Sequence, residues 1–106
     1  MSGGIITGSV LGDDGVDTIN LNSGTVGHID GGAGDDIITL NGATILSENT
    51  LVGGAGNDTI NLLSGSVINV EAGDGNDVMT LGAATVSGII QFGDGSDTLT
   101  LSLIHI

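Results

Sequence analysis

Five short segments of the chain alternate between apolar and polar residues. They are residues 18–21, 37–40, 59–62, 78–81 and 98–101. Alternation with a period of two is typical of a β-strand with one buried face. The buried face is predicted to carry Ile19, Leu21, Ile38, Leu40, Ile60, Leu62, Met79, Leu81 and Leu99. The opposite face carries mostly Thr and Asn, which suit an exposed pleated surface.

A turn of small residues follows each alternating strand and leads into a second, less regular apolar segment. The predicted second strands are Thr25 to Asp30, Thr44 to Val52, Ser66 to Glu71 and Thr85 to Gln91. Thr44 to Val52 is the longest of them, and we interpret Ser47-Glu48-Asn49 within it as a surface insertion or bulge. The pattern predicts a coil made of a strand, a plain turn, a second strand and a loop to the next coil.

A glycine-rich loop that ends in aspartate precedes every alternating strand. The five acidic loops are loop 1 (residues 12–17), loop 2 (31–36), loop 3 (53–58), loop 4 (72–77) and loop 5 (92–97). Their last residues, called here the fixed Asp residues, are Asp17, Asp36, Asp58, Asp77 and Asp97, at spacings of 19, 22, 19 and 20 residues. Such a period predicts an all-β solenoid of about five coils, two short strands to a coil, over residues 1–100. Because Val10 already occupies the place of the apolar residue before each later loop, we expect a part of a longer array.

The central loop and the start of its strand read Gly53-Gly54-Ala55-Gly56-Asn57-Asp58-Thr59-Ile60-Asn61. This stretch resembles the calcium-binding nonapeptide Gly-Gly-x-Gly-x-Asp-x-U-x of RTX (hemolysin-type) proteins, in which U is apolar. The resemblance covers nearly all of the chain. It implies a parallel β-roll or β-solenoid that folds on binding calcium outside the cell, where it steadies an attached toxin, enzyme or adhesin and favours secretion. In the family both turns of a coil carry the nonapeptide, whereas here only one turn does, which indicates a calcium ladder along one edge.

The composition of the loops suits calcium, which takes six to eight oxygen ligands from carboxylates, carbonyl groups and water. Glycine lets successive carbonyl groups turn toward one point, and the fixed Asp adds a carboxylate. Five loops on stacked coils leave four gaps, and thus room for up to about four calcium ions. The predicted ligand residues are Gly15, Asp17, Gly32, Gly34, Asp36, Gly54, Gly56, Asp58, Gly73, Gly75, Asp77, Gly93, Gly95 and Asp97. An ordinary β-turn also favours Asp and Gly, but five copies in register favour a metal site.

Two other sets of loop residues are not expected to be required ligands. The residue before the fixed Asp varies among Val16, Asp35, Asn57, Asn76 and Ser96. Asp14, Asp74 and Asp94 share a position that holds alanine in loops 2 and 3, so we interpret them as auxiliary charge.

Charge and composition narrow the classes of partner. The 106 residues include 13 acidic residues and no Lys or Arg, which gives a formal net charge of −13. Nucleic acid and anionic lipid are excluded as partners because both are bound through basic residues. The chain has no Cys, so a disulfide or thiolate site is excluded. No apolar run approaches the roughly 18 residues of a membrane span, and the first residues lack the features of a secretory signal.

These observations predict a calcium-binding repeat module of an exported bacterial protein, secreted or on the cell surface, attached to the rest of a larger parent chain. No catalytic residue is expected, because His28 lacks a catalytic partner and the paired carboxylates lack a pocket. A structural spacer or passenger solenoid of an adhesin or autotransporter is the alternative. An ice-binding surface formed by the Thr and Asn rows is a third reading, which Ile37 and Val78 interrupt.

Residues 101–106 depart from the repeat pattern. The sequence Leu101-Ser102-Leu103-Ile104-His105-Ile106 resembles the translation of a transposon-derived sequencing adaptor in one reading frame. We therefore expect the native sequence to end near Thr100 or Leu101, and we expect no role for His105.

Overall fold

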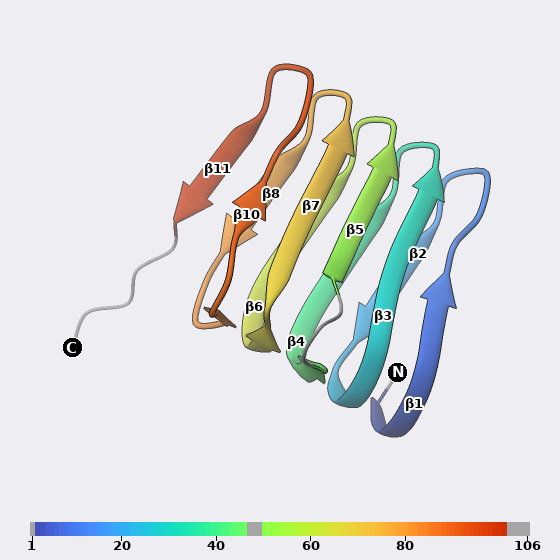
Figure 1. The fold of residues 1–106 in the computed structure, drawn as a ribbon, viewed down its shortest axis with the longest axis vertical. Helices are drawn as coiled ribbons and strands as arrows, with labels where there is room; N and C mark the ends of the chain where they lie inside the picture. Colours follow the sequence, from blue (N-terminus) through green and yellow to red (C-terminus); the bar gives the residue numbers. More distant parts are fainter. Residues whose placement is uncertain (1, 47–49, 102–106) are drawn as a thin grey trace.

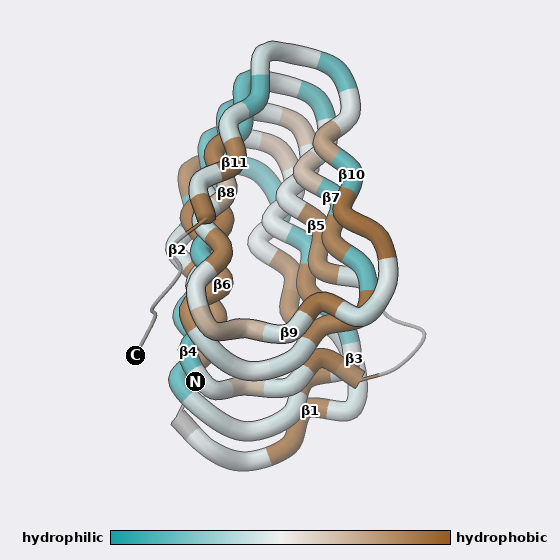
Figure 2. The backbone as a smooth tube through the Cα atoms, turned by 90° about the vertical axis from the view of Figure 1, so that its left-hand side faces the viewer, coloured by the Kyte–Doolittle hydropathy of each residue, from teal (hydrophilic) through white to brown (hydrophobic). Residues whose placement is uncertain are grey.

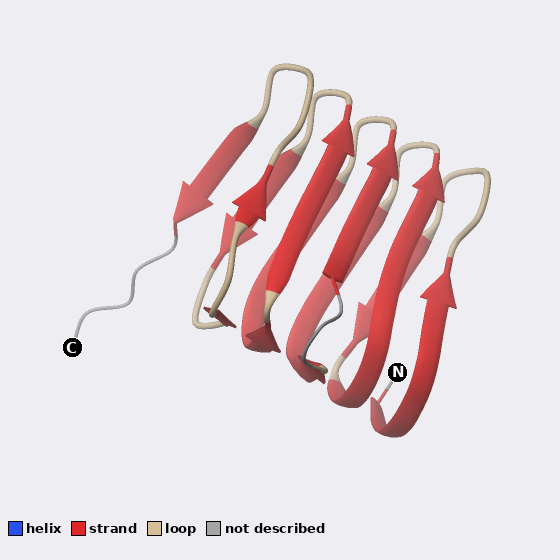
Figure 3. Cartoon of the chain, in the orientation of Figure 1, coloured by secondary structure: helices blue, strands red, loops and turns tan. Residues whose placement is uncertain are grey.

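The strands of this chain are short, parallel and wound into successive coils. The computed structural model describes residues 2–46 and 50–101, and within them it contains eleven strands and no helix (Figure 3). The strands are β1 (Ser2–Leu11), β2 (Thr18–Leu21), β3 (Ser23–Ala33), β4 (Ile37–Ile45), β5 (Thr50–Ala55), β6 (Thr59–Val67), β7 (Asn69–Asp74), β8 (Val78–Leu81), β9 (Thr85–Val86), β10 (Ile90–Gln91) and β11 (Thr98–Leu101). The predicted insertion at Ser47-Glu48-Asn49 and the tail beyond Leu101 lie outside the described residues.

Every strand pairs in parallel with its counterpart in the neighbouring coil. On one side of the stack, β2, β4, β6, β8 and β11 pair in turn, and on the other side β1, β3, β5, β7 and β10 do so (Figure 1). The acidic loops join the two sides and lie together at one end of the coils. The predicted all-β solenoid of about five coils is confirmed.

The alternating strands were predicted in their correct register, because residues of like role stand directly above one another. Ile19 pairs with Ile38, which pairs with Ile60 and in turn with Met79. The side chains of Ile38, Ile60 and Met79 are fully buried. The second inward ladder of this side consists of Leu21, Leu40, Leu62 and Leu81.

Thr25 to Asp30 lies within the single strand β3, but the other three second strands differ from the prediction, because the coil has a third, short side between its two longer ones. Thr44 to Val52 is divided between β4 and β5, Ser66 to Glu71 between β6 and β7, and Thr85 to Gln91 between β9 and β10. The side labelled β9 in Figure 2 forms the base of each coil, opposite the acidic loops. The inward residues explain the bend: Val67 and Val70 are both buried but stand three positions apart, so strict alternation breaks between them.

The predicted core position of Leu99 is not confirmed. Leu99 pairs with Met79, yet its side chain is 42% exposed, whereas that of Met79 is fully buried. Each coil of a solenoid is covered only by its neighbours, and no further coil follows β11 in the described residues. The core of the central coils is therefore closed, and that of the last coil is open.

Two outward residues interrupt the Thr and Asn rows, as the sequence indicates. Ile37 and Val78 are 41% and 40% exposed.

No helix in the part of the chain that the structure describes is long and apolar enough to span a membrane.

Candidate metal centre

The acidic loops are compact turns whose shape depends on glycine at the second and fourth positions. In loop 3 these residues are Gly54 and Gly56, with φ angles of 109° and 131°. A Cβ atom at Gly54 would overlap the carbonyl oxygen of Gly32, and one at Gly56 would overlap that of Gly34. Glycine is thus required both for the left-handed backbone and for the close approach of the preceding coil.

The loops are joined to one another by backbone hydrogen bonds. The Gly34 N–H donates to the Ala55 carbonyl group at 2.7 Å, and the Gly56 N–H donates to the Asp74 carbonyl group at 2.9 Å. Equivalent bonds link loop 1 to loop 2 and loop 4 to loop 5. The loops therefore form a continuous stack with the same register as the strands.

The fixed Asp side chains form a second ladder, inside the turn. The Asp58 Oδ1 atom accepts a hydrogen bond from the Asp36 N–H at 2.9 Å, and the Asp77 Oδ1 atom accepts one from the Asp58 N–H at 2.8 Å. Asp36 and Asp97 accept from the N–H groups of Asp17 and Asp77 in the same way, both at 2.9 Å. Each carboxylate thus caps the backbone of the coil before it.

The other carboxylate oxygen of the fixed Asp has no partner. The Oδ2 atoms of Asp17, Asp36, Asp58 and Asp77 are buried without a hydrogen bond. The side chains of Asp36, Asp58 and Asp77 are only 1% exposed. An unpaired buried carboxylate oxygen is costly, so the four atoms together indicate that a cationic partner belongs there.

Burial also changes the ionisation of these carboxyl groups. Burial raises the pKa of Asp58 from 3.8 to about 6, against the hydrogen bond from the Asp36 N–H, which lowers it. The neighbouring carboxylates of Asp77 and Asp36 add to the rise in this pKa. Burial likewise raises the pKa values of Asp36 and Asp77. At neutral pH the carboxylates of Asp36, Asp58 and Asp77 are thus charged at a cost that a bound cation would relieve.

The first residue of the loop borders the unpaired oxygen. At Gly31, the point where a Cβ atom would stand lies 2.7 Å from the Asp36 Oδ2 atom and 2.5 Å from the Gly53 carbonyl oxygen. At Gly53, the same point lies 2.8 Å from the Asp58 Oδ2 atom and 2.5 Å from the Ala72 carbonyl oxygen. A carboxylate oxygen of the same loop and a carbonyl oxygen of the following loop therefore both lie against the side of each glycine where other residues carry a side chain.

Comparison with known families agrees with this geometry. Residues 28–43, 47–66 and 69–84 match the family model for the RTX calcium-binding nonapeptide repeat (4 copies). The chain belongs to the RTX repeat family. RTX repeats bind calcium. No curated protein and no solved structure gave a match.

The RTX loops suit calcium in the kind of oxygen that they present. Calcium accepts carboxylate and backbone carbonyl oxygens in a flexible arrangement, and both kinds meet beside the first-position glycines. No group of three or more His, Cys, Asp or Glu side chains gathers around one point in residues 2–46 and 50–101. Backbone carbonyl groups and water would therefore supply most of the coordination shell of a bound calcium ion, and the fixed Asp would be its charged ligand.

The structure divides the predicted ligand residues into two groups. The fixed Asp residues point into the turn and approach the backbone of neighbouring loops, as described above. The predicted glycines all shape the turn with positive φ angles, and all but Gly15 stack against carbonyl groups of the preceding coil; they are Gly15, Gly32, Gly34, Gly54, Gly56, Gly73, Gly75, Gly93 and Gly95. Gly15 has no atom of another coil within 4 Å of the point where a Cβ would stand, since no loop precedes loop 1 in the described residues.

Sequence reasoning did not assign a role to the first-position glycines or to the residue before the fixed Asp. Gly12, Gly31 and Gly53 border the unpaired oxygens, and their recurrence in loops 1 to 3 was the sequence signal that could have indicated this role.

The residue before the fixed Asp forms an outer ladder of hydrogen bonds between neighbouring loops. The Asn57 N–H donates to the Asp35 Oδ1 atom, and the Asn76 N–H donates to the Asn57 Oδ1 atom, both at 2.8 Å.

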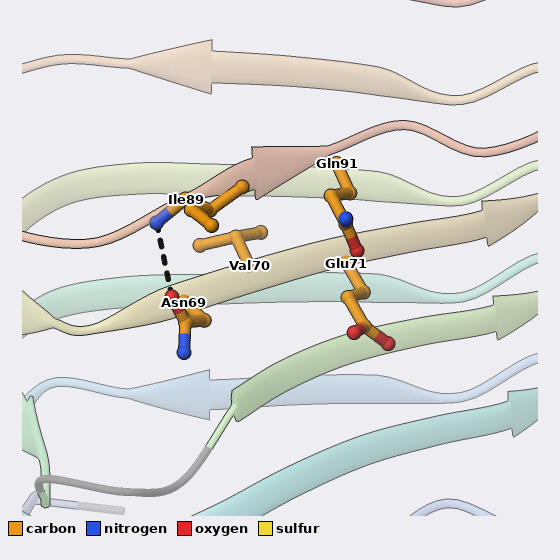
Figure 4. A pocket seen from close by; sticks show the side chains of 5 residues that line it. All are labelled: Asn69, Val70, Glu71, Ile89 and Gln91. Carbon is orange, nitrogen blue, oxygen red and sulfur yellow. Dashed lines mark hydrogen bonds between the residues drawn. The ribbon is translucent and has the colours of Figure 1, made fainter.

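A shallow hollow away from the loops does not resemble a ligand site. It has a volume of about 150 Å³ and is lined by Asn69, Val70, Glu71, Ile89 and Gln91 (Figure 4). The Asn69 side chain is already engaged, since its Oδ1 atom accepts a hydrogen bond from the Ile89 N–H at 2.9 Å. The hollow reflects the imperfect fit of β10 on β7, which pair over only two residues.

Proposed function

We propose that this chain is a calcium-binding RTX module in which ions enter between the stacked acidic loops and complete the fold. The observation that carries the proposal is the set of four buried, unpaired Oδ2 atoms on the fixed Asp residues. In loops 1 to 3 the Oδ2 atom of the fixed Asp lies beside the first-position glycine, so close that a Cβ atom there would overlap it. A cation there would neutralise a carboxylate and supply the partner that the protein lacks.

The charge of the chain supports the same role. Thirteen acidic residues face no Lys or Arg, so no basic side chain of the chain offsets their repulsion. Since the acidic loops stack directly on one another, this repulsion is concentrated along one edge. Up to about four divalent ions, one for each gap between loops, would offset a large part of it.

The predicted ligands keep their assignments within this proposal. The carboxylates of Asp17, Asp36, Asp58, Asp77 and Asp97 are the charged ligands. The glycines of the second and fourth loop positions hold the backbone in the turn that presents carbonyl groups. Asp14, Asp74 and Asp94 lie on exposed positions of the loops and contribute general negative charge.

For the cellular role, we propose a module of a larger exported bacterial protein that orders outside the cell, where calcium is abundant, and that steadies an attached domain. A spacer in an adhesin or autotransporter is the alternative role, and it needs no dependence on calcium. No catalytic step is assigned to this segment. The buried carboxylates favour the calcium-dependent module over the spacer, because a spacer has no need to bury charge.

A calcium titration of the full chain tests the proposal. Circular dichroism should show little β-structure in chelator and a β-rich spectrum at roughly 10⁻⁴–10⁻³ M calcium, the range of extracellular calcium modules. Isothermal titration calorimetry gives the number of ions. A β-rich spectrum in chelator that calcium does not change, together with no heat of binding, would reject the calcium-dependent module and favour the spacer.

A further inference from the structure

The gaps between the acidic loops are not equivalent, because the first loop residue changes along the chain. Loops 1, 2 and 3 begin with Gly12, Gly31 and Gly53, whereas loops 4 and 5 begin with Ala72 and Phe92. The pairing fixes this correspondence: Val52 and Gly54 pair with Glu71 and Gly73, so Ala72 stands at the position of Gly53.

Alanine at this position adds a methyl group on the side where, in the earlier loops, the glycine lies against two oxygen atoms. Ala72 is fully buried, so its methyl group points into the coil. At Gly53 a Cβ atom would lie 2.8 Å from the Asp58 Oδ2 atom, and at Gly31 one would lie 2.7 Å from the Asp36 Oδ2 atom. These distances are shorter than carbon and oxygen atoms tolerate in ordinary van der Waals contact, so the two kinds of loop cannot be alike here.

A Cβ atom at the first loop position would also overlap a carbonyl oxygen of the following loop. At Gly31 and Gly53 a Cβ atom would lie 2.5 Å from the carbonyl oxygen of the next loop's first residue. In loop 4 the carboxylate and carbonyl oxygens cannot approach the first residue as closely as in loops 1 to 3, because Ala72 carries a Cβ atom. The Asp77 Oδ2 atom nevertheless remains buried and unpaired, so the need for a cation persists although the oxygens around the first residue are arranged differently.

We infer that the first residue of each acidic loop sets the calcium affinity of the gap that it borders. The gaps that begin at Gly12, Gly31 and Gly53 are the tight calcium sites, and the gap that begins at Ala72 is a weaker one. This inference rests on the proposed function and adds a grading of its sites. The array then fills in two stages, with the three tight gaps first and the gap between loops 4 and 5 last.

Replacement of the buried methyl group tests this grading in the full chain. In calorimetric titrations, the wild type should show a tight class of sites and one weaker site. Ala72→Gly should bring that site into the tight class, with an affinity gain of about tenfold or more. A purely structural role for Ala72 predicts the opposite, because losing a buried methyl group weakens the fold and would raise the calcium midpoint of folding.

Two further variants complete the experiment. Ala55→Gly is the matched control, since Ala55 is an exposed loop residue and the substitution carries the same backbone entropy change. It should leave the calcium affinities unchanged. Gly53→Ala should move one tight site to the weak class, and circular dichroism shows whether this variant still folds.

The outcomes separate the inference from the function on which it rests. Two results would overturn the grading alone. One is equal calcium affinity at all sites of the wild type, and the other is an Ala72→Gly variant whose weakest site binds calcium no more tightly than that of the wild type. Absence of calcium binding by the wild type would overturn both the grading and the proposed function. If Gly53→Ala does not fold, the comparison of Ala72→Gly with Ala55→Gly still decides.

Discussion

The two oxygens of the fixed Asp have different surroundings and therefore different roles. In Asp58, the Oδ1 atom accepts a hydrogen bond from the Asp36 N–H at 2.9 Å, while the Oδ2 atom is buried and unpaired. Asparagine has the same shape and retains an oxygen at Oδ1, but its amide nitrogen cannot act as a metal ligand. The substitution therefore separates the capping role of the side chain from its ligand role.

We expect Asp58→Asn to stabilise the calcium-free fold and to weaken calcium binding. Without calcium, removal of a buried charge whose pKa is raised to about 6 should stabilise the fold by up to about 3 kcal/mol. With calcium, the variant should bind about one ion fewer and fold at a higher calcium midpoint. Circular dichroism in chelator, where the variant should show more β-structure than the wild type, and calorimetric titration measure the two effects.

Asp94→Asn is the matched control for that experiment. It removes the same charge from an exposed loop position. Its number of bound ions should stay the same, and its calcium midpoint should move only slightly. Equal effects from Asp58→Asn and Asp94→Asn would mean that total charge, and not ligation by the fixed Asp, governs folding.

A second residue with a distinct role is Asp13, the only described non-glycine residue with a positive φ, at 71°. It occupies the second loop position, which is Gly32 in loop 2 and glycine in the three later loops. A Cβ atom at Gly32 would overlap the Asp13 carbonyl group of the preceding coil. Asp13 has no preceding loop above it in the described residues, so the only cost of its side chain is the strained backbone.

We expect Asp13→Gly to stabilise the folded chain by about 1 kcal/mol, because glycine adopts this backbone conformation without the Cβ penalty. Asp14→Gly is the control, since it removes the same charge from a residue whose φ is not positive. It should give no gain. Urea denaturation of both variants in saturating calcium provides the measurement, and equal stabilities would show that charge, not backbone strain, is responsible.

At the scale of the element, the loop stack is joined by two side-chain ladders that run in opposite directions. In the inner ladder the carboxylate accepts from the coil before it, whereas in the outer ladder Asp35, Asn57 and Asn76 accept from the coil after them. The outer ladder includes uncharged amides and lies on exposed positions. Asn57 and Asn76 therefore join the loops without adding to the repulsion of the inner carboxylates, whereas Asp35 adds its charge to that repulsion.

We expect Asn57→Ala to destabilise the calcium-bound fold by about 0.5–1.5 kcal/mol, because the Asn76 N–H loses its acceptor. Ser96→Ala should have almost no effect, since Ser96 takes part in the ladder through its backbone N–H, which donates to the Asn76 Oδ1 atom. Urea denaturation in saturating calcium compares the two. A loss of stability as large in Ser96→Ala as in Asn57→Ala would contradict a specific role for the outer ladder.

The sequence predicted some elements better than others, and the reasons are physical. The strands after each fixed Asp were predicted in register because period-two alternation and a repeated loop act together. The third side was missed because its bend follows from inward residues such as Val67 and Val70, whose three-residue spacing fits no single strand. The burial of the unpaired Oδ2 atoms depends on the register between coils, and the composition of the loops does not determine that register.

At the scale of the molecule, the calcium-free stack is opposed by its own carboxylates. The chain has a net charge of −13, and three fixed Asp residues are 1% exposed. Their raised pKa values mean that the folded chain holds protons more tightly than the unfolded chain does. Protons and calcium ions should therefore act as alternative means of neutralising the same groups.

We expect the calcium-free fold to be more stable at about pH 5 than at about pH 7.5. Between the ordinary pKa of 3.8 and the folded pKa of about 6 for Asp58, the folded state binds more protons, so stability falls as the pH rises and levels off above this window. In saturating calcium the trend should reverse, because protons compete with the ions. The β-structure content in chelator and the thermal unfolding temperature in saturating calcium, both followed by circular dichroism at the two pH values, test this. A calcium-free fold that is no more stable at the lower pH would contradict it.

The direction of the inner ladder gives the two ends of the stack unequal sensitivity to damage. Removing the last coil would take away Asp97, whose Oδ1 atom accepts from the Asp77 N–H. That N–H, inside the turn, would lose its acceptor. Removing the first coil would instead leave an oxygen of Asp36 without its donor, at an end of the stack that water can reach. Fraying at the C-terminal end would thus leave a backbone donor unpaired, whereas fraying at the N-terminal end would leave a carboxylate acceptor unpaired.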